Sequence, residues 1–371
     1  MTLNRIYMKN ICIVVGARPN FMKVAPLVRA IINAREKGEP VDYRLVYTGK
    51  EDDPTLEPTL YDDLGIKRPD AFLGVDCVSL NELTGQVMGA FERYLAANQT
   101  DIVIVVDDLA STMAVSIVTK KAGVRLAHLV AGTRSFDINM PKEINRLVID
   151  GLSDMLFTAG AGSSSVATRA GAELSRIYMV GNILMDTLRY NHGRLCRPAL
   201  WDSMGLEKGK YMLFTLNRRA LMDNEDNLRA MLRSMAEASA GMMILAPLRG
   251  RARETVERLM PEDLCIRLIE PLKYLEFGYL AANAVGVVTD SGNVAEEATF
   301  NNVPCITLNS YTEHVETVKT GTNVLVGENA AMLFDAVKKM LSGEWKHGTL
   351  PDRWDGRTAE RILHCLLVEE K

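Results

Sequence analysis

The sequence predicts an α/β protein made of two Rossmann-like domains with a ligand cleft between them. Short runs rich in Val, Ile and Leu alternate with longer helical patterns, which is typical of parallel sheets covered by helices on both faces. This alternation runs through the first half of the chain and starts again near residue 211. A chain of 371 residues is also long enough for two domains of similar size.

The expected strands follow from short apolar runs that end in Gly, Asp, Asn or Pro. The polar stretch 191–208, which contains Pro198 and Gly205, is the expected connection between the domains. Helical patterns fill the segments between strands, for example residues 21–34, 80–97 and 224–240. The expected strands are 11–16, 43–49, 102–106, 125–130, 155–160 and 177–181 in the first half, and 211–215, 242–247, 265–271, 284–292, 304–308 and 323–327 in the second.

Composition and charge argue against several classes of protein. A hydrophobic content of 47% with 24% charged residues is that of a soluble globular protein, and the net charge of -4 favours neither nucleic acid nor an anionic membrane. No apolar run approaches the ~20 residues of a membrane span, and the first residues do not resemble a signal peptide. The 6 cysteines are scattered and the 5 histidines lack metal-ligand spacing. We therefore expect a cytoplasmic protein without disulfides or a bound metal.

Ligands of open parallel sheets collect beyond the carboxyl ends of the strands, so the residues that follow each strand are the candidates for function. In VVGARPNFMKVAP, Arg18 lies in the turn after the first strand and Lys23 about one turn inside the next helix. A helix amino terminus beside two cations is a plausible anion cradle. The alternative interpretation is a solvated loop with an ordinary surface Arg and Lys.

The stretch VVTDSGNVAEEA makes a stronger case for a binding site. An apolar strand ends in Asp290, and Ser291 and Gly292 turn the chain into a helix that carries two glutamates. Glycine lets a backbone approach a phosphate, and a carboxylate about one turn into the helix can accept both hydroxyls of a ribose. The alternative is that Asp290 or Ser291 only caps the helix.

Two further strand ends carry polar residues. Asp107 and Asp108 follow the strand at 102–106, and because adjacent strand residues point to opposite faces, at most one of them is expected to enter the cleft. The other, or both, could cap the next helix. Asn217, Arg218 and Arg219 follow the strand at 211–215, where arginines would suit a diphosphate or simply lie in a solvated loop.

These stretches together closely resemble the non-hydrolysing UDP-N-acetylglucosamine 2-epimerase family. The resemblance covers nearly the whole chain and rests on VVGARPNFMKVAP, STMA, AGTRSFDINMPKEINRLV, VGNILMDTL, TDSGNVAEE and TEHVETVKTGTNVLVG. It implies the GT-B type of architecture and a homodimer that binds a UDP-N-acetylhexosamine in the cleft. It also implies a reaction in which UDP is eliminated to give a 2-acetamidoglucal, and UDP is then added back to that glucal with the opposite configuration at C2. It implies no metal or redox cofactor.

The resemblance also implies the domain limits and the roles of residues. It places an N-terminal domain at 1–183, a C-terminal UDP-binding domain at 184–355, and a last helix, within 356–371, that packs back on the first domain. Glu297 matches the ribose-binding glutamate, and Asn293 stands where the family has a second glycine. The substrate-binding positions that it implies are Arg18, Lys23, Arg134, Arg146, Arg218, Asp290, Ser291, Gly292, Asn293, Glu297 and His314.

The chain departs from the family at the reaction site. The family has Glu where this chain has Val130, Glu where it has Lys142, and His where it has Asn217, so three of four expected acid/base or leaving-group residues are replaced. The fourth, an Asp, is retained as Asp108. Its neighbour Asp107 replaces a Gly, Leu248 replaces a His and His314 replaces an Arg. The candidate catalytic residues are therefore Asp108, Glu143, Lys142 and Asn217, the last two at substituted positions.

These departures leave three hypotheses. The chain is an epimerase of reduced activity, or a UDP-sugar-binding homologue without epimerase chemistry, or an altered UDP-sugar transferase or hydrolase that uses Asp108 with Lys142 or Glu143. Valine cannot transfer a proton, and Asn has no useful pKa for general acid–base catalysis. The segment 128–150 is therefore interpreted as the remnant of a catalytic loop.

Overall fold

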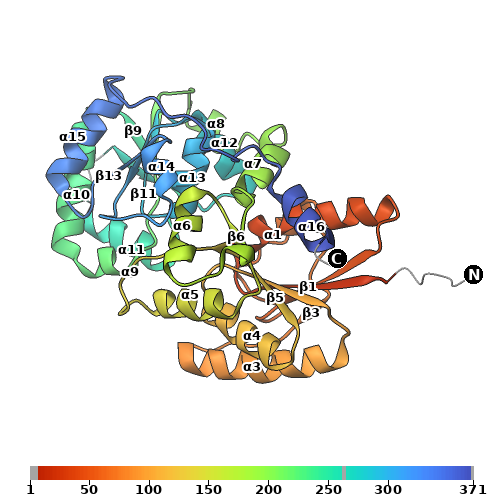
Figure 1. The fold of residues 1–371 in the computed structure, drawn as a ribbon. Coiled ribbons are helices and arrows are strands. Elements are labelled where there is room, and N and C mark those ends of the chain that lie inside the picture. The colour runs from red at the N-terminus through yellow and green to blue at the C-terminus, as the bar shows by residue number, and fades with distance from the viewer. Residues whose placement is uncertain (1–6, 261–264, 369–371) are drawn as a thin grey trace, which may run out of the picture. The chain divides into compact units, whose positions relative to one another are not determined.

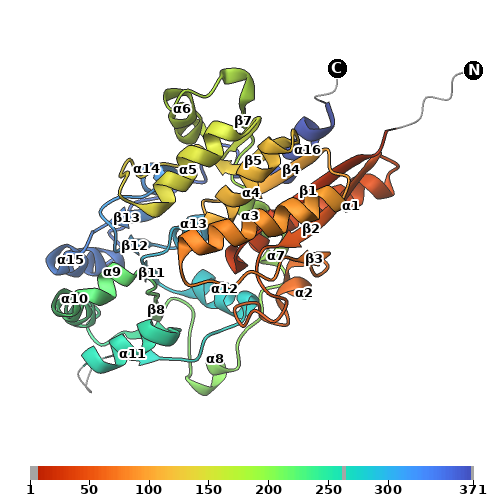
Figure 2. The ribbon, with the colours of Figure 1, turned by 90° about the horizontal axis from the view of Figure 1, so that it is seen from below.

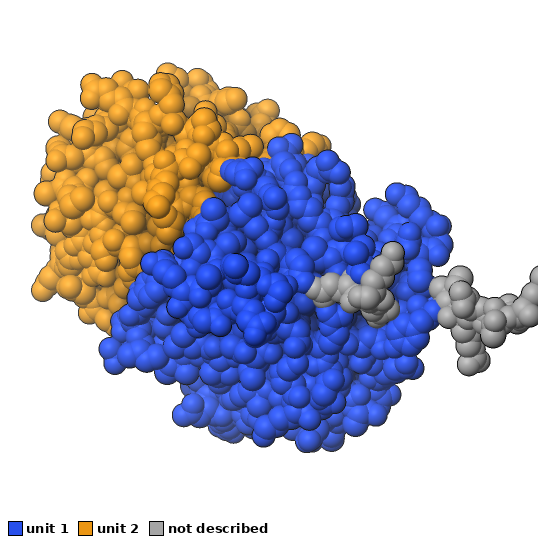
Figure 3. All heavy atoms as spheres, in the orientation of Figure 1, with its two compact units in different colours: residues 1–190, 352–371 blue, residues 191–351 orange. Residues whose placement is uncertain are grey.

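The computed structural model describes residues 7–260 and 265–368. Figure 3 shows its two compact units: unit 1 contains residues 1–190 and 352–371, and unit 2 contains residues 191–351. Helix α7 (Ile183–His192), which begins at the expected domain limit, stays largely with unit 1. The reason is local packing, because the Thr187 hydroxyl donates to the Met22 carbonyl and the Arg29 guanidinium lies 3.8 Å from the Tyr190 ring centroid.

Unit 1 is built on a parallel sheet of seven strands in the order β3-β2-β1-β4-β5-β6-β7. Ile13 in the interior strand β1 pairs with Leu45 on one side and Ile104 on the other, and all three are fully buried. Such strands consist mostly of apolar residues because helices cover both faces. The strands are β1 (Lys9–Val15), β2 (Val41–Tyr47), β3 (Ala71–Phe72), β4 (Ile102–Val106), β5 (Arg125–Ala131), β6 (Met155–Thr158) and β7 (Ile177–Met179).

Helices cover the two faces of this sheet, as Figures 1 and 2 show. Helices α3, α4 and α5 lie side by side on one face, where Val87 and Phe91 pack against the strands. Helices α1 and α16 lie together on the other. The helices of this unit are α1 (Arg18–Glu36), α2 (Leu60–Leu64), α3 (Leu80–Ala97), α4 (Ala110–Lys121), α5 (Pro141–Leu152), α6 (Ala161–Arg169), α7 and α16 (Thr358–Val368), with a short 3-10 turn, η1 (Leu174–Arg176).

The C-terminal helix is tied to unit 1 at both of its ends. At its start, the amides of Thr358 and Ala359 donate to the Asp186 carboxylate in α7 at 3.2 and 2.8 Å. Near its end, the Lys9 ammonium donates to the Leu366 carbonyl at 2.6 Å. The first-turn amides of a helix need acceptors, and here a side chain from another helix supplies them.

Unit 2 contains a parallel sheet of six strands in the order β10-β9-β8-β11-β12-β13, with an apolar cluster on each face. Its strands are β8 (Tyr211–Phe214), β9 (Met243–Ala246), β10 (Ile266–Leu268), β11 (Gly286–Thr289), β12 (Cys305–Thr307) and β13 (Asn323–Leu325). Its helices are α8 (Leu200–Ser203), α9 (Arg219–Asp223), α10 (Glu225–Ala238), α11 (Gly250–Leu259), α12 (Tyr274–Asn283), α13 (Gly292–Phe300), α14 (Val315–Lys319) and α15 (Ala330–Leu341).

Both sheets reverse their strand order beside their first strand. The reversal lies between β1 and β4 in unit 1 and between β8 and β11 in unit 2. Loops leave such a point in opposite directions and open a crevice at the carboxyl edge, where doubly wound folds bind their ligands. The predicted α/β class with two Rossmann-like domains is confirmed. No helix in the described ranges 7–260 and 265–368 is long and apolar enough to cross a membrane.

Candidate active site

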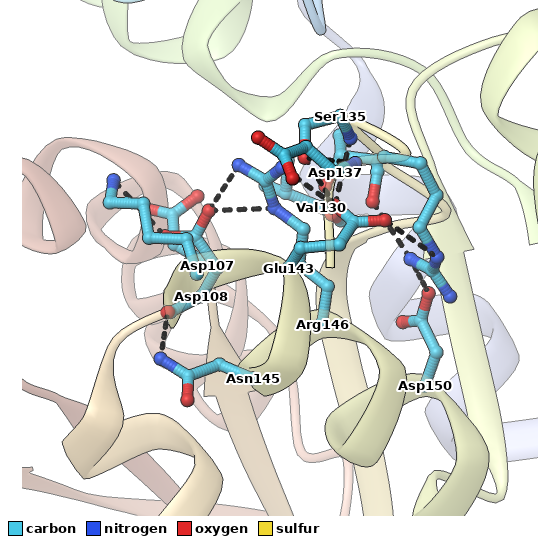
Figure 4. Close-up of polar contacts among 12 residues, drawn as sticks. Asp107, Asp108, Val130, Ser135, Asp137, Glu143, Asn145, Arg146 and Asp150 are labelled. Carbon is cyan, nitrogen blue, oxygen red and sulfur yellow. Dashed lines mark hydrogen bonds and ion pairs between the residues drawn. The ribbon is translucent and has the colours of Figure 1, made fainter. Parts of the chain in front are cut away.

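The polar residues of unit 1 gather where β1, β4 and β5 end and α5 begins, as Figure 4 shows. Asp107 is the first residue after β4, and its carboxylate accepts from Lys23 Nζ at 2.6 Å and from Asn20 Nδ2 at 2.8 Å. Lys23 is only 6% exposed. The alternative interpretation of Lys23 as an ordinary surface lysine therefore does not hold, because the carboxylate that follows β4 pairs with it.

Asp107 and Asp108 both take part in this cluster. Strand alternation ends with Val106, and Asp107 has a φ of 57°, a left-handed conformation that redirects the chain. Lys23, the partner of Asp107, also contributes to the electrostatic environment of Asp108. Capping does not explain this acidic pair, because the N-cap residue of α4 is the apolar Leu109.

Asp108 is held by cations from α5. Arg146 donates to Asp108 Oδ2 through Nε at 2.8 Å and Nη2 at 2.5 Å, while Lys142 Nζ lies 3.3 Å from Oδ1. Burial would raise the pKa of Asp108, but the positive charges of Lys142 and Arg146 outweigh it and keep the pKa below its ordinary value. A carboxylate in this state is a weaker base than an unpaired one.

Glu143 fixes the loop that follows β5. Its carboxylate accepts from the Ser135 amide at 2.8 Å, the Ser135 hydroxyl at 2.9 Å and the Phe136 amide at 3.3 Å. Arg146 Nη1 lies 3.3 Å from the same carboxylate, which is 3% exposed. Burial alone would raise the pKa of Glu143, but these donors lower it. Such contacts are those of a residue that positions a loop.

Beneath this loop, Asp150 joins three elements. Its Oδ1 lies 2.6 Å from His128 Nδ1, and its Oδ2 accepts from Arg134 Nη1 at 2.7 Å and from the Gly132 amide at 3.2 Å. Burial would raise the pKa of Asp150, but His128 and Arg134 lower it. Arg134, an expected substrate-binding residue, is 8% exposed and therefore holds the loop from below.

Val130 lies at an irregularity of β5, between this loop and the strand. Its φ is 71°, and the register with β6 shifts between Leu129 and Ala131. A positive φ is a genuine outlier for a β-branched residue, because its branched side chain crowds the backbone in this conformation. Residues held in this way cluster at functional sites, where the surrounding structure imposes the conformation. The surroundings of Val130 therefore keep a backbone shape that valine disfavours.

The first loop of unit 1 is internally paired. The amides of Gly16 and Ala17 both donate to Asn20 Oδ1, at 2.9 and 3.1 Å. Arg18 Nε donates to Glu57 Oε2 at 2.5 Å, and both side chains are partly buried. The loop and the helix amino terminus of the expected anion cradle are present, but several donors there already have partners within unit 1, and anion binding stays a prediction.

In unit 2, Asp290 bridges the reversal point between β8 and β11. Its Oδ2 accepts from the amides of Asn217 at 2.7 Å and Arg218 at 2.5 Å, and its buried Oδ1 has no hydrogen-bond partner within the described part of the chain. Burial raises the pKa of Asp290, although these amides oppose the shift. Asp290 therefore fixes the loop after β8. Ser291 is the N-cap residue of α13, but its side chain accepts no hydrogen bond from the amides of this described helix, so capping does not explain it.

The start of α13 contacts His314. A Cβ added to Gly292 would lie 2.5 Å from His314 Cδ2, so only glycine leaves room for this ring. His314 Nδ1 lies 2.8 Å from Glu296 Oε1. Arg218 Nη1 lies 2.9 Å from Asn309 Oδ1 and 3.4 Å from Glu328 Oε1. Glu297 is 8% exposed, Asn293 half-buried and Asn217 exposed.

Sequence reasoning did not single out His128, Asp150 and Asn20, although α5 carried a signal for one of them. Glu143, Arg146 and Asp150 follow one another at three and four residues and therefore share one face of the helix. All three are buried. Polar residues at helical spacing next to a strand end thus indicated an inward-facing polar network. No group of three or more His, Cys, Asp or Glu within residues 7–260 and 265–368 is arranged to hold a metal.

Comparison with known proteins gives consistent results. Residues 33–367 match the family model described as UDP-N-acetylglucosamine 2-epimerase. A UDP-N-acetylglucosamine 2-epimerase of Methanocaldococcus jannaschii is 32% identical over 367 residues, covering 95% of this chain and 98% of that protein. A UDP-2,3-diacetamido-2,3-dideoxy-D-glucuronate 2-epimerase of Pseudomonas aeruginosa is 32% identical over 331 residues, covering 88% and 91%.

Solved structures agree with these relatives. The crystal structure of Methanocaldococcus jannaschii UDP-GlcNAc 2-epimerase in complex with UDP-GlcNAc and UDP has a TM-score of 0.83 to this chain. The two sequences are 30% identical, and the similarity covers 96% of this chain and 99% of that one. The predicted GT-B type of fold is thereby confirmed.

The strain at Val130 leads to a test of stability. Replacing Val130 with Gly should leave the free energy of unfolding unchanged or raise it by up to about 1 kcal/mol, because relief of roughly 1–3 kcal/mol of strain offsets lost burial and the flexibility of glycine. Val103→Gly, at a regular position of β4, should instead cost about 3 kcal/mol. Urea unfolding of both variants measures this difference. Equal losses would show that the backbone at Val130 is unstrained.

Proposed function

The chain belongs to the UDP-N-acetylglucosamine 2-epimerase family, and we propose that it binds UDP-N-acetylhexosamines but that its 2-epimerase activity is strongly impaired. Val130 carries this proposal. An apolar side chain stands at the strained end of β5, where the family presents a carboxylate. UDP-GlcNAc and UDP-ManNAc, the two sugars that the family reaction interconverts, are the proposed ligands.

Ligand binding is supported mainly by unit 2. Asp290 holds the loop after β8, Gly292 leaves the start of α13 without a side chain, and Glu297 lies about one turn into that helix. These features suit a phosphate near the helix amino terminus and a ribose near the glutamate. The loop after β8 and the start of α13 are backbone features, and Glu297 is a side chain of unit 2. The substitutions in unit 1 therefore do not alter these features.

Impairment is supported by what the family reaction needs. Elimination of UDP requires a base to take the proton at C2 and a donor to stabilise the departing diphosphate, and re-addition requires a proton on the opposite face. Val130 has no titratable group, Asn217 offers only an amide, and Lys142 is a cation in place of a carboxylate. Asp108 keeps its carboxylate, but its lowered pKa weakens it as a base.

The alternative of an altered transferase or hydrolase has less support. It would rely on Asp108, Lys142 or Glu143 for acid–base chemistry. Glu143 already accepts hydrogen bonds from Ser135 and Phe136, and Asp108 is bonded twice by Arg146. A general base must be able to approach the proton that it removes. These two carboxylates are instead committed to holding the loop and α5 in place.

The role of Glu297 can be tested with two ligands. Glu297→Ala should weaken UDP by roughly 1.5–3 kcal/mol, because charge-assisted hydrogen bonds to the ribose are lost. Pyrophosphate, which has no ribose, should be affected much less. Titration calorimetry of the parent chain and of Glu297→Ala, each with UDP and with pyrophosphate, measures the difference. Equal weakening would contradict the ribose role, and a parent chain that does not bind UDP would contradict the proposed function.

Catalytic impairment can be tested by exchange at C2. The parent chain, incubated with UDP-N-acetylglucosamine in deuterated water, should show little or no deuterium at C2 by NMR. A positioned acid or base contributes ~10²–10⁴-fold, and groups of one catalytic unit act together. The combination Val130→Glu, Lys142→Glu and Asn217→His should therefore recover exchange, while each single change should recover little. Rapid conversion by the parent chain would refute the proposal.

We also infer a homodimer, which the family resemblance implies, and a cytoplasmic location, which the scattered cysteines favour. Ile144 and Leu147 lie one turn apart on α5 and are 45% and 44% exposed. They form a small apolar patch on the surface of this helix, which a second chain would cover. Light scattering should give the mass of two chains. Leu147→Glu should shift that mass toward one chain, whereas Leu174→Glu, at an exposed position of η1, should not. A parent that is monomeric at all concentrations would contradict the dimer.

A further inference from the structure

We propose that Lys142, and not Lys23, is the cation of unit 1 that binds the phosphate oxygens of a uridine diphosphate ligand. The inference rests on the proposed function, because it assigns a contact to the same ligand. It also assigns Lys142 a binding role in place of the acid–base role that its position would suggest. Asp107, which pairs with Lys23, then prevents that lysine from binding the ligand.

Lys23 is already neutralised within the protein. Its ammonium lies 2.6 Å from Asp107 Oδ1, and its side chain is 7% exposed. Asn20, which is 2% exposed, donates to the other oxygen of the same carboxylate at 2.8 Å. A phosphate that approached Lys23 would meet this carboxylate, and like charges at short range repel one another. Asp107 therefore acts as an internal anion at the place where a ligand anion would otherwise sit.

The neighbouring arginines are also committed to protein partners. Arg18 pairs with Glu57 at 2.5 Å, and Arg134 pairs with Asp150 at 2.7 Å. Arg146 is 2% exposed and pairs with Asp108 and Glu143. If one of these arginines turned to a ligand, its carboxylate partner would lose that ion pair while buried or partly buried. Loss of an ion pair in such a place costs free energy.

Lys142 differs from these residues in exposure and in the strength of its contact. Its side chain is 59% exposed, and its ammonium lies 3.3 Å from Asp108 Oδ1, a longer distance than the other lysine pair in this cluster. Arg146 donates two bonds to the other oxygen of Asp108. Lys142 can therefore turn toward a ligand while Asp108 stays compensated.

The position of Lys142 in α5 supports the same assignment. It is the second residue of a helix of 12 residues, where the aligned peptide dipoles disfavour a cation and favour an anion. A bound phosphate would compensate both the ammonium and the helix end. Asp108 compensates this ammonium at 3.3 Å with a carboxylate that Arg146 also binds, so a phosphate would add a second anion beside Lys142.

The test is titration calorimetry with UDP on variants of the whole chain. Lys142→Met should weaken UDP by roughly ten- to hundredfold, the effect of losing a charge-assisted hydrogen bond, and Lys142→Arg should keep most of the affinity. Lys23→Met made together with Asp107→Asn removes both charges of that pair and should change the affinity by less than about threefold. Lys121→Met, which removes an exposed lysine at the end of α4, serves as the control and should leave UDP binding unchanged.

Two further variants separate direct binding from indirect effects. Asp107→Asn should strengthen UDP binding by roughly threefold or more because it releases Lys23, and adding Lys23→Met should remove that gain. In an Asp108→Asn background, Lys142→Met should still weaken UDP by about tenfold or more, which excludes an effect of the uncovered Asp108 charge.

The outcomes are distinct. Unchanged UDP binding by Lys142→Met, or loss of its effect in the Asp108→Asn background, would overturn the inference while UDP binding by the parent would still support the proposed function. A loss of affinity in the Lys23→Met, Asp107→Asn pair that exceeds the loss in Lys142→Met would also overturn it. If the chain with this pair does not fold, Asp107→Asn alone decides, because unchanged UDP binding by that variant contradicts a sequestered Lys23. A parent chain that does not bind UDP would refute both proposals.

Discussion

Compensation of buried charge is the constraint on which the unit 1 site depends. The carboxylates that follow β4 and line α5 lie where water is largely excluded, and an ionised group in such a place needs a partner of opposite charge or several hydrogen bonds. Lys23 with Asp107, Arg146 with Asp108 and Glu143, and Arg134 with Asp150 meet this need. Their pairing also fixes the loop after β5, because Glu143 binds the Ser135 and Phe136 amides.

The two units place a carboxylate in a similar way at the point where the strand order of each sheet reverses. In each, a carboxylate follows the strand beyond the reversal point and accepts hydrogen bonds from the segment that follows the first strand, which is helix α1 in unit 1 and a loop in unit 2. Asp107 binds Asn20 and Lys23 in unit 1, and Asp290 binds the Asn217 and Arg218 amides in unit 2. The difference lies in the donors, because side chains are engaged in unit 1 and backbone amides in unit 2. The carboxylate of unit 1 therefore neutralises the Lys23 ammonium, whereas the carboxylate of unit 2 leaves the Arg218 guanidinium for other contacts.

Two positions at which the family resemblance implies substitutions have unusual backbone conformations. Asp107 has a left-handed backbone at a position where the resemblance implies glycine, and Val130 has a positive φ at the irregular end of β5. The surrounding sheet and α5 impose both conformations, because their packing contributes more than the local preference of either residue. The backbone at these two positions is thus set by the surrounding structure more than by the side chain that each position carries.

The sequence by itself determined the fold class, most of the strands and the positions at which polar residues follow them, since apolar runs of strand length and their spacing are properties of the chain. The resemblance of its motifs extended this to the GT-B type and the family. Tertiary structure decided how the polar residues are paired. That Lys23 meets Asp107, that Glu143 holds a loop, and that His128 and Asp150 join beneath it depend on strands and helices distant in sequence. Charge pairing acts through space over a few ångströms, so only the folded arrangement of β1, β4, β5 and α5 could set these partners.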